Sequence, residues 1–256
     1  MSRRIAPRET RETRESQNSR ICNETRSKTA AIVITAAMLV VALASSCTTT
    51  TTFNGSQEEC DYALHYVLDK ANESTLSKLF FRITETQTFI SDDLSFILQH
   101  ADEIPGIRKL LDEWTQSMSR YTLDWFEGFT TYTTSLAKGL QFDDPQKMVL
   151  ESDFSAALTM ESVYGESILS YVKTTLKGAD LTKWDEVAAQ YNAWTKTRSV
   201  LYGEENPSLG EVDIVDDMAG YICKLYFDDL KASETLLRTT PDPNADPTVA
   251  KVFGLD

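Results

Sequence analysis

The sequence is short of the residues that catalytic and metal-binding motifs need. It holds only two histidines, His65 and His100, and four cysteines. A Ser/His/Asp site needs a base beside its nucleophile, and a zinc site needs several closely spaced ligands. Neither pattern occurs in the sequence, and G-x-S-x-G, H-E-x-x-H and a phosphate-binding glycine loop are also missing. We therefore predict no catalytic residue, no metal and no cofactor, and we expect both histidines to be structural.

Glycine and proline are also scarce, with 10 and 7 residues, and no repeat of solenoid period occurs. This composition excludes collagen-like, glycine-rich and low-complexity disordered proteins. The hydrophobic fraction of 41% is enough for a packed core, but it is too low for a protein that crosses a membrane several times.

Positive charge is scarce outside the amino-terminal segment. The chain has 25 Lys and Arg against 39 Asp and Glu, a formal net charge of -14. Residues 1–46 hold 8 basic and 4 acidic residues, so the rest of the chain carries 17 basic and 35 acidic ones, a net charge of -18. Such acidity repels nucleic-acid phosphates and anionic lipid headgroups. We therefore expect no nucleic-acid partner.

Residues 1–46 resemble a secretory signal peptide with a long basic leader. No charged residue occurs between Lys28 and Glu58. The apolar stretch from Ala30 to Ala44 is shorter than the ~20 residues that a full membrane span needs. Basic residues precede this stretch and small residues follow it, as in export signals. The sequence therefore predicts an exported protein that has lost this segment.

The end of this segment offers two cleavage sites. Leu43-Ala44-Ser45-Ser46-Cys47 resembles a bacterial lipobox, although Ala44 stands where leucine is usual. Lipidation would make Cys47 the first residue and anchor the protein to a membrane. Five threonines, Thr48 to Thr52, then suit a flexible tether over residues 47–57. Alternatively, cleavage after Ala42-Leu43-Ala44 would release a soluble secreted or periplasmic protein, and the apolar stretch could also stay as an uncleaved anchor.

Two cysteines, Cys60 and Cys223, remain in the domain predicted for residues 58–256. Export permits disulfide formation, so the two could pair with each other. The alternative is that each is a separate buried thiol, which packs like a small apolar residue. Both lie in predicted helices, which suits either alternative.

Residues 58–256 are predicted to form a single all-α domain, because no segment alternates with the two-residue period of a strand. The clearest helix begins at Pro105, and its apolar residues are Ile107, Leu110, Leu111, Trp114, Met118, Tyr121 and Trp125. Their spacing follows the helical period of 3.6 residues. The other predicted helices span 58–71, 74–84, a short segment after Ser91, 144–151, a segment capped by Asp153 that ends before Gly178, 181–194 and 211–238. The apolar end 250–255 is expected to dock on the body of the domain.

Aromatic residues gather on two of these helices. Most are expected to be core residues. Trp114, Tyr121, Trp125 and Trp184 could instead line an apolar groove between helices, a common location for ligands in helical proteins.

Four pairs of adjacent aspartates invite a metal or hydrolase interpretation. The pairs are Asp92/Asp93, Asp143/Asp144, Asp216/Asp217 and Asp228/Asp229. Three of them fall near predicted helix starts, where capping explains them better. Residues 242–246 imitate the start of a calcium-binding loop, but Pro247 and Phe253 stand where that loop needs Gly and Glu. A proline-stiffened linker is the better interpretation.

Short motifs along the chain resemble a bacterial family, domain of unknown function 4197. They are Ile107 to Arg120, Phe142-Asp143-Asp144, Ala156-Ala157, Gln190-Tyr191-Asn192, Asp213-Ile214, Leu237-Arg238-Thr239-Thr240-Pro241 and Lys251-Val252-Phe253-Gly254. The resemblance implies an exported helical protein, frequently with a signal peptide, and it implies no known activity or catalytic residue.

Taken together, the sequence predicts a cell-envelope lipoprotein that is not an enzyme. Its acidic helical domain would act as a binding or structural module, with an envelope protein as one possible partner. The first alternative is a carrier of a small apolar or cationic ligand in the aromatic groove. The second is an envelope hydrolase that uses paired carboxylates.

Overall fold

The computed structural model describes residues 55–85, 90–91, 94–203, 208–209, 212–242, 244 and 246–255. Within these residues every regular element is a helix and no strand occurs, which confirms the predicted all-α fold. The described helices belong to one compact unit, Phe53–Asp256. The predicted signal peptide, Cys47 and the tether up to residue 54 lie outside the described residues, as does the pair Asp92/Asp93.

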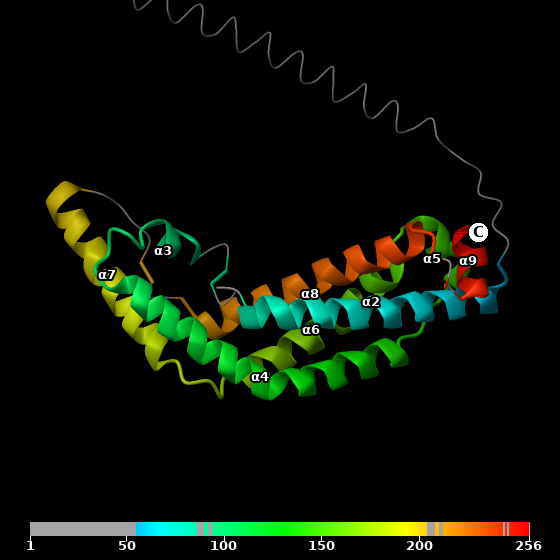
Figure 1. The fold of residues 1–256 in the computed structure, drawn as a ribbon, viewed down its shortest axis with the longest axis horizontal. Coiled ribbons are helices and arrows are strands. Elements are labelled where there is room, and N and C mark those ends of the chain that lie inside the picture. The colour runs from blue at the N-terminus through cyan, green and yellow to red at the C-terminus, as the bar shows by residue number, and fades with distance from the viewer. Residues whose placement is uncertain are drawn as a thin grey trace, which may run out of the picture. The chain divides into compact units, whose positions relative to one another are not determined.

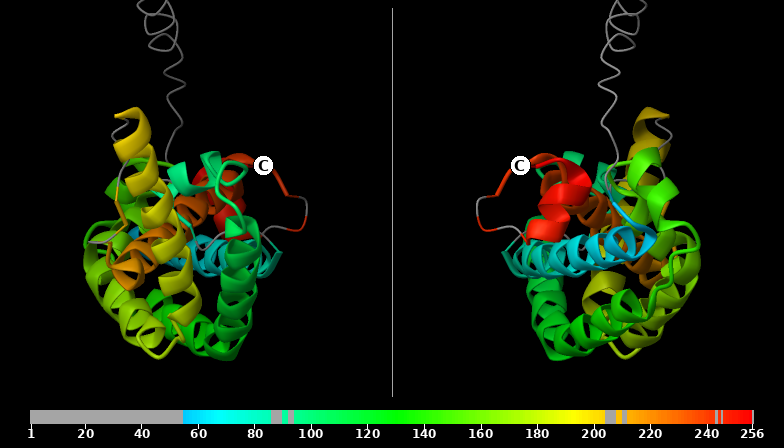
Figure 2. Two further views of the ribbon diagram at one scale, coloured as in Figure 1. Left: turned by 90° about the vertical axis from the view of Figure 1, so that its left-hand side faces the viewer. Right: turned by 90° about the vertical axis from the view of Figure 1, so that its right-hand side faces the viewer.

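Four long helices form an antiparallel bundle around a shared hydrophobic core. They are α2 (Gln57–Glu85), α4 (Ile107–Gly139), α6 (Ser155–Leu176) and α8 (Ile214–Thr239). Helix α2 packs on α4 and α8, and α6 also packs on both, so the four close a ring (Figures 1 and 2). The contacts of Lys78 with Ser233 and of Arg82 with Asp229 show that α2 and α8 run in opposite directions.

Shorter elements cover the two ends of this bundle. Helix α7 (Thr182–Tyr202) packs on the first half of α4, and the short α3 (Phe96–Gln99) lies beside it (Figure 1). Helices α5 (Pro145–Glu151) and α9 (Pro247–Phe253) pack on α2 at the opposite end.

Helix α2 begins with a capping box. The Ser56 hydroxyl accepts a hydrogen bond from the Glu59 backbone N–H at 3.2 Å, and the Glu59 carboxylate accepts one from the Ser56 N–H at 2.8 Å. This reciprocal pair satisfies two of the backbone donors that a helix start leaves free. Helix α2 therefore begins at Gln57, one residue before the predicted helix start at residue 58.

The predicted break between residues 71 and 74 is wrong, because α2 continues through it to Glu85. Asn72 is almost fully buried at this point. Its side-chain oxygen accepts a hydrogen bond from the Tyr226 hydroxyl at 2.7 Å, and its amide donates one to Thr134 at 3.3 Å. Tertiary contacts with α8 and α4 therefore keep the helix continuous where local propensity is weak.

Helix α4 starts at Ile107 rather than Pro105, because Gly106 before it adopts a left-handed φ of 80°. The threonines near residue 132 do not end the helix. Thr133 is fully buried, and its hydroxyl donates a hydrogen bond to the Phe129 carbonyl at 3.0 Å. That bond satisfies the hydroxyl within the helix itself, so the helix continues to Gly139.

Of the two aspartates predicted to cap helix starts here, one caps its helix and the other does not. Asp144 caps α5 as expected, since its carboxylate accepts the Lys147 N–H at 3.1 Å. The predicted Asp153 cap of α6 is wrong, because the N-cap residue is Phe154 and its side chain makes no capping bond. The carboxylate of Glu234, from α8, caps that helix instead.

The carboxy-terminal segment docks on the body, which confirms the prediction for 250–255. Val249 and Val252 of α9 pack on Cys60, Ala63 and Val67 of α2. Asp246, in the segment that imitates a calcium loop, caps α9 by accepting the N–H groups of Thr248 and Val249, so it serves as a helix cap.

Candidate functional site

Among the described residues, Cys60 and Cys223 are free thiols, so the disulfide alternative for this pair is wrong. Cys60 lies 22 residues before Arg82 in α2, a distance of about 33 Å along the helix at ~1.5 Å per residue. Cys223 lies beyond the level of Arg82, because Arg82 contacts Asp229 and α8 runs antiparallel to α2. A disulfide needs Cα atoms about 5.5 Å apart. Each cysteine is instead buried in a different hydrophobic cluster.

Both histidines pack against aromatic rings. The His65 ring lies 4.7 Å from that of Phe142, and the His100 ring lies 4.9 Å from that of Trp194. His100 also contacts Glu103 at 3.3 Å. These contacts fit the structural role expected for both.

The described aspartate pairs do not act as pairs. Asp216 contacts Lys173, whereas Asp217 accepts a hydrogen bond from Ser91. In the pair on α8, Asp228 contacts Lys224, whereas Asp229 contacts Arg82 on the opposite side. Adjacent side chains on a helix diverge by about 100°, so neighbouring aspartates point to different surroundings. Within the described part of the chain, no three His, Cys, Asp or Glu side chains gather as metal ligands.

The four aromatic residues predicted to line a groove occupy packed positions. Trp114 and Trp184 are buried against each other, with ring centroids 5.6 Å apart. Trp125 packs edge-on against Phe129 at 5.7 Å. The Tyr121 hydroxyl donates a hydrogen bond to the Thr175 carbonyl at 2.5 Å. The contacts of Trp114, Trp184 and Tyr121 lie between α4 and its neighbours α7 and α6, and Trp125 is buried in the hydrophobic core.

At one end, the α6–α8 interface is sealed by a buried ion pair. Arg238 donates to Glu234 at 2.9 Å, and the two side chains are 1% and 0% exposed. Glu234 also accepts the backbone N–H groups of Ala156 and Ala157, at 3.1 and 2.7 Å, which caps α6. Burial raises the pKa of Glu234, and these two N–H donors and the Arg238 guanidinium oppose that rise.

The Arg238 guanidinium also contacts other elements through its terminal nitrogens and its face, whereas its Nε is buried without a hydrogen-bond partner among the described residues. It donates to the Ser155 hydroxyl at 3.0 Å and to the Val149 carbonyl at 2.9 Å, and the Phe253 ring of α9 covers it at 4.6 Å. The pair therefore ties α5, α6, α8 and α9 together. These contacts give the pair a structural role at this end of the bundle.

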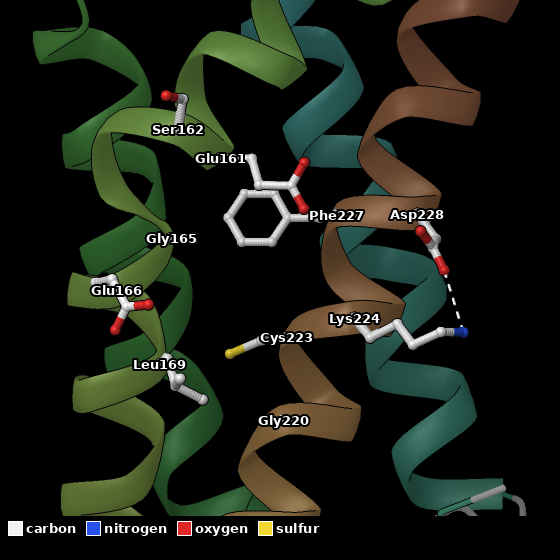
Figure 3. Close-up of a pocket in the computed structure, with 10 residues that line it drawn as sticks. All are labelled: Glu161, Ser162, Gly165, Glu166, Leu169, Gly220, Cys223, Lys224, Phe227 and Asp228. Atoms are coloured by element: carbon white, nitrogen blue, oxygen red, sulfur yellow. Dashed lines mark ion pairs between the residues drawn. The ribbon is translucent and has the colours of Figure 1, made fainter.

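Further along, the same two helices separate and leave an open groove of about 420 Å³ (Figure 3). Phe227 and Cys223 project from α8 toward α6 and form the floor together with Leu169 of α6. Phe227 and Cys223 are 4% and 8% exposed. Burial raises the pKa of the Cys223 thiol to about 12, so the thiol is neutral and poorly nucleophilic at neutral pH. The floor is therefore apolar.

The walls of the groove are mainly acidic. Glu161 and Glu166 come from α6, and Asp228 and Lys224 come from α8. Lys224 contacts Asp228 at 3.3 Å on the outer side of α8 (Figure 3), and Glu161 contacts Lys231 at 2.7 Å. Glu166 forms no ion pair within the described residues and takes no further contact that would neutralise it. The groove therefore combines an apolar floor with excess negative charge at its edge.

Two glycines inside helices, Gly165 of α6 and Gly220 of α8, line this groove. A Cβ built on Gly220 would meet no atom within 4 Å, and one on Gly165 would meet only the Glu161 side chain at 3.9 Å. Gly128 of α4 differs, because a Cβ there would lie 2.7 Å from the Tyr171 hydroxyl. Packing thus requires Gly128 but neither groove glycine, although each costs the helix about 1 kcal/mol relative to alanine.

A second, shallower pocket of about 500 Å³ lies on the other side of α6. It is lined by Tyr132 and Tyr171, whose rings stack at 4.6 Å, and by Glu166. Glu166 therefore stands between two depressions, and its carboxylate is accessible from both.

This groove is not predictable from the hydrophobic pattern, because its walls come from residues 161–169 and 220–228, which only the antiparallel packing of α6 and α8 brings together. A usable signal was present in the two isolated glycines inside apolar helical patterns, since such glycines often have a packing or functional reason.

Comparison with protein-family models, curated proteins and solved structures found no match to this chain. The resemblance to domain of unknown function 4197 therefore stays a prediction. Among the residues that the structure describes, none of the helices combines the length and apolarity that a membrane crossing requires.

Proposed function

We propose that this protein is a cell-envelope lipoprotein, anchored by a lipid on Cys47, whose acidic helical domain is a binding module. One observation carries the proposal: the order of features at the start of the domain. A lipobox-like sequence ends at Cys47, a polar threonine-rich stretch follows, and the capping box at Ser56 and Glu59 then starts the first helix. The ten residues 47–56 can span at most about 35 Å, which suits a tether.

The groove between α6 and α8 supports the binding part of this proposal. Helical bundles commonly bind ligands between their helices. The side chains of the buried Glu234–Arg238 pair are almost entirely inaccessible, whereas the groove is open and has a carboxylate at its edge and glycines where side chains would fit. The groove is therefore the surface that we assign to binding.

Metabolic labelling with a radioactive fatty acid in the producing cells tests the anchor. We expect label in the parent chain and none in Cys47→Ala. Cys22→Ala is the matched control, because Cys22 lies in the segment that would be removed, and it should keep full labelling. Equal labelling of the parent and Cys47→Ala would refute the anchor.

The intact mass of the mature protein separates the remaining alternatives. A lipidated chain would begin at Cys47 and carry the added mass of its acyl groups. A chain that begins at Ser45 without added mass would instead support the soluble form released after Ala44, and an uncleaved chain would support the third alternative.

A further inference from the structure

We propose that the α6–α8 groove binds a small organic cation, in which an ammonium group is carried on an apolar alkyl or aryl body. This inference rests on the proposed function only in its choice of the groove as the binding surface. It does not depend on the lipid at Cys47.

The floor of the groove is suited to the apolar body of such a ligand. Phe227, Cys223 and Leu169 line it, and a volume of about 420 Å³ lies within the range typical of small-molecule sites. The free thiol of Cys223 is more than nine-tenths buried, and its sulfur points from α8 toward α6 (Figure 3). A neutral thiol and an aromatic ring offer polarisable surface but no strong hydrogen-bond donor for an anion.

The charges of the groove favour a cation. Glu166 has no basic partner within the described residues, and it lines the groove together with the Phe227 ring, whereas Glu161 is paired with Lys231. A carboxylate next to an aromatic face attracts an ammonium group by direct charge and by the quadrupole of the ring. The strongly acidic surface of the domain repels anions over a longer range.

The two glycines indicate that the open space is retained for an occupant. Neither Gly165 nor Gly220 is required by a close contact, so larger residues would fit without rearranging the backbone. Such residues would fill the groove from both sides. A ligand that needs this space explains why helix-destabilising residues line the groove on both α6 and α8.

Selective labelling with ¹⁵N-glycine allows a direct test on the full chain in detergent micelles. The sequence has ten glycines, so the amide spectrum holds few signals, and eight of the glycines lie outside the groove. The variants Gly165→Ala and Gly220→Ala each remove one signal and thereby assign it. Benzylammonium is the probe, and benzyl alcohol and benzoate, of similar size but neutral or negative, are its controls.

We expect benzylammonium to shift the signals of Gly165 and Gly220 saturably, with the other glycines unchanged. Benzyl alcohol should bind at least about tenfold more weakly, and benzoate should cause no shift. Glu166→Gln, a conservative change at an exposed position, should weaken benzylammonium binding about fivefold. Gly220→Leu should abolish the shift of Gly165.

Three outcomes would overturn the inference. The first is no shift at either groove glycine at tens of millimolar probe. The second is equal binding of all three probes, which would remove the preference for a cation. The third is a similar shift at all ten glycines, which would show binding without a site. None of these outcomes bears on fatty-acid labelling of Cys47, so failure here and failure of the lipid anchor are distinguishable.

Discussion

The two ends of the α6–α8 interface differ in how closely the helices pack: one end is filled by a buried ion pair, and the other is left open as a groove. Near the start of α6, Glu234 and Arg238 are buried, and they form hydrogen bonds with each other and with backbone groups of α6 and α5. Two to three turns further along α6, Gly165 and Gly220 leave a groove where side chains would fit. The sealed end therefore holds four helices together, whereas the open end gives up some stability and leaves space for a ligand.

The largest change in the free energy of unfolding is expected at the sealed end, where Glu234 and Arg238 are buried. Glu234→Ala leaves the Arg238 charge buried without its partner and removes the cap of α6, so it should lower the free energy of unfolding by about 3–5 kcal/mol. Urea denaturation of the full chain measures this. Glu161→Ala is the matched control on the groove wall, where the exposed pair with Lys231 is worth only about 0–1 kcal/mol. Similar losses in both variants would contradict the structural role of Glu234.

The next largest change in the free energy of unfolding is expected at the groove, where substitutions should stabilise the protein. Gly165→Ala and Gly220→Ala should each raise the free energy of unfolding by about 0.5–1 kcal/mol, because alanine is the better helix former and the space is open. Gly128→Ala is the control, and it should not be stabilising, because the Tyr171 hydroxyl must move. If both groove variants are less stable than the parent in urea, the glycines serve packing after all.

The rate at which the Cys223 thiol is alkylated tests whether the groove floor is apolar. Its pKa of about 12 lies roughly three units above that of an ordinary thiol, so the thiolate fraction at pH 8 should be about a thousandfold smaller. We expect iodoacetamide to alkylate Cys223 correspondingly more slowly than glutathione, as measured by peptide mass mapping. A rate within tenfold of glutathione would show a solvated or cation-activated thiol.

The smallest effect concerns α9, which covers the sealed end. The Lys251 side chain and the Ser56 N–H donate hydrogen bonds to Glu59 and lower its pKa. A lowered carboxyl pKa contributes stability above the ordinary value of 4.5, and this contribution is lost as the pH falls through the lowered pKa. The melting temperature of Glu59→Gln should therefore lie below that of the parent at pH 6, and the difference should shrink toward pH 3.

Glu58→Gln is the matched control for this pH series, since Glu58 takes part in neither hydrogen bond. Its difference from the parent should be smaller at pH 6. A difference for Glu59→Gln that grows on acidification would show that the carboxylate does not support the docking of α9.

The sequence was sufficient for the features that depend on neighbouring residues. The 3.6-residue spacing from Ile107 to Trp125 predicts α4, and Asp144-Pro145 predicts the start of α5. The features that were missed depend on distant residues. The carboxylate that caps α6 lies 77 residues from the Ala157 N–H that it binds. Asn72 keeps α2 continuous through a bond to Tyr226, 154 residues away.

The groove that we propose as the site differs from the one predicted from the sequence for a related reason. Aromatic residues suggested a groove at Trp114 and Trp184, but large rings fill space, and these two pack against each other. The open groove occurs where side chains are small. Its location therefore depended on which faces of α6 and α8 meet, and the hydrophobic pattern of each helix alone does not determine that.

Thermal unfolding of the parent and Gly220→Leu, each with and without benzylammonium, tests most directly whether the groove is kept open for a ligand. We expect Gly220→Leu to melt at a higher temperature than the parent without the probe, since leucine is the better helix former and can cover the apolar floor. The probe should then raise the melting temperature of the parent but not that of the variant. A variant that melts below the parent, or a probe that raises both equally, would contradict this explanation of the groove.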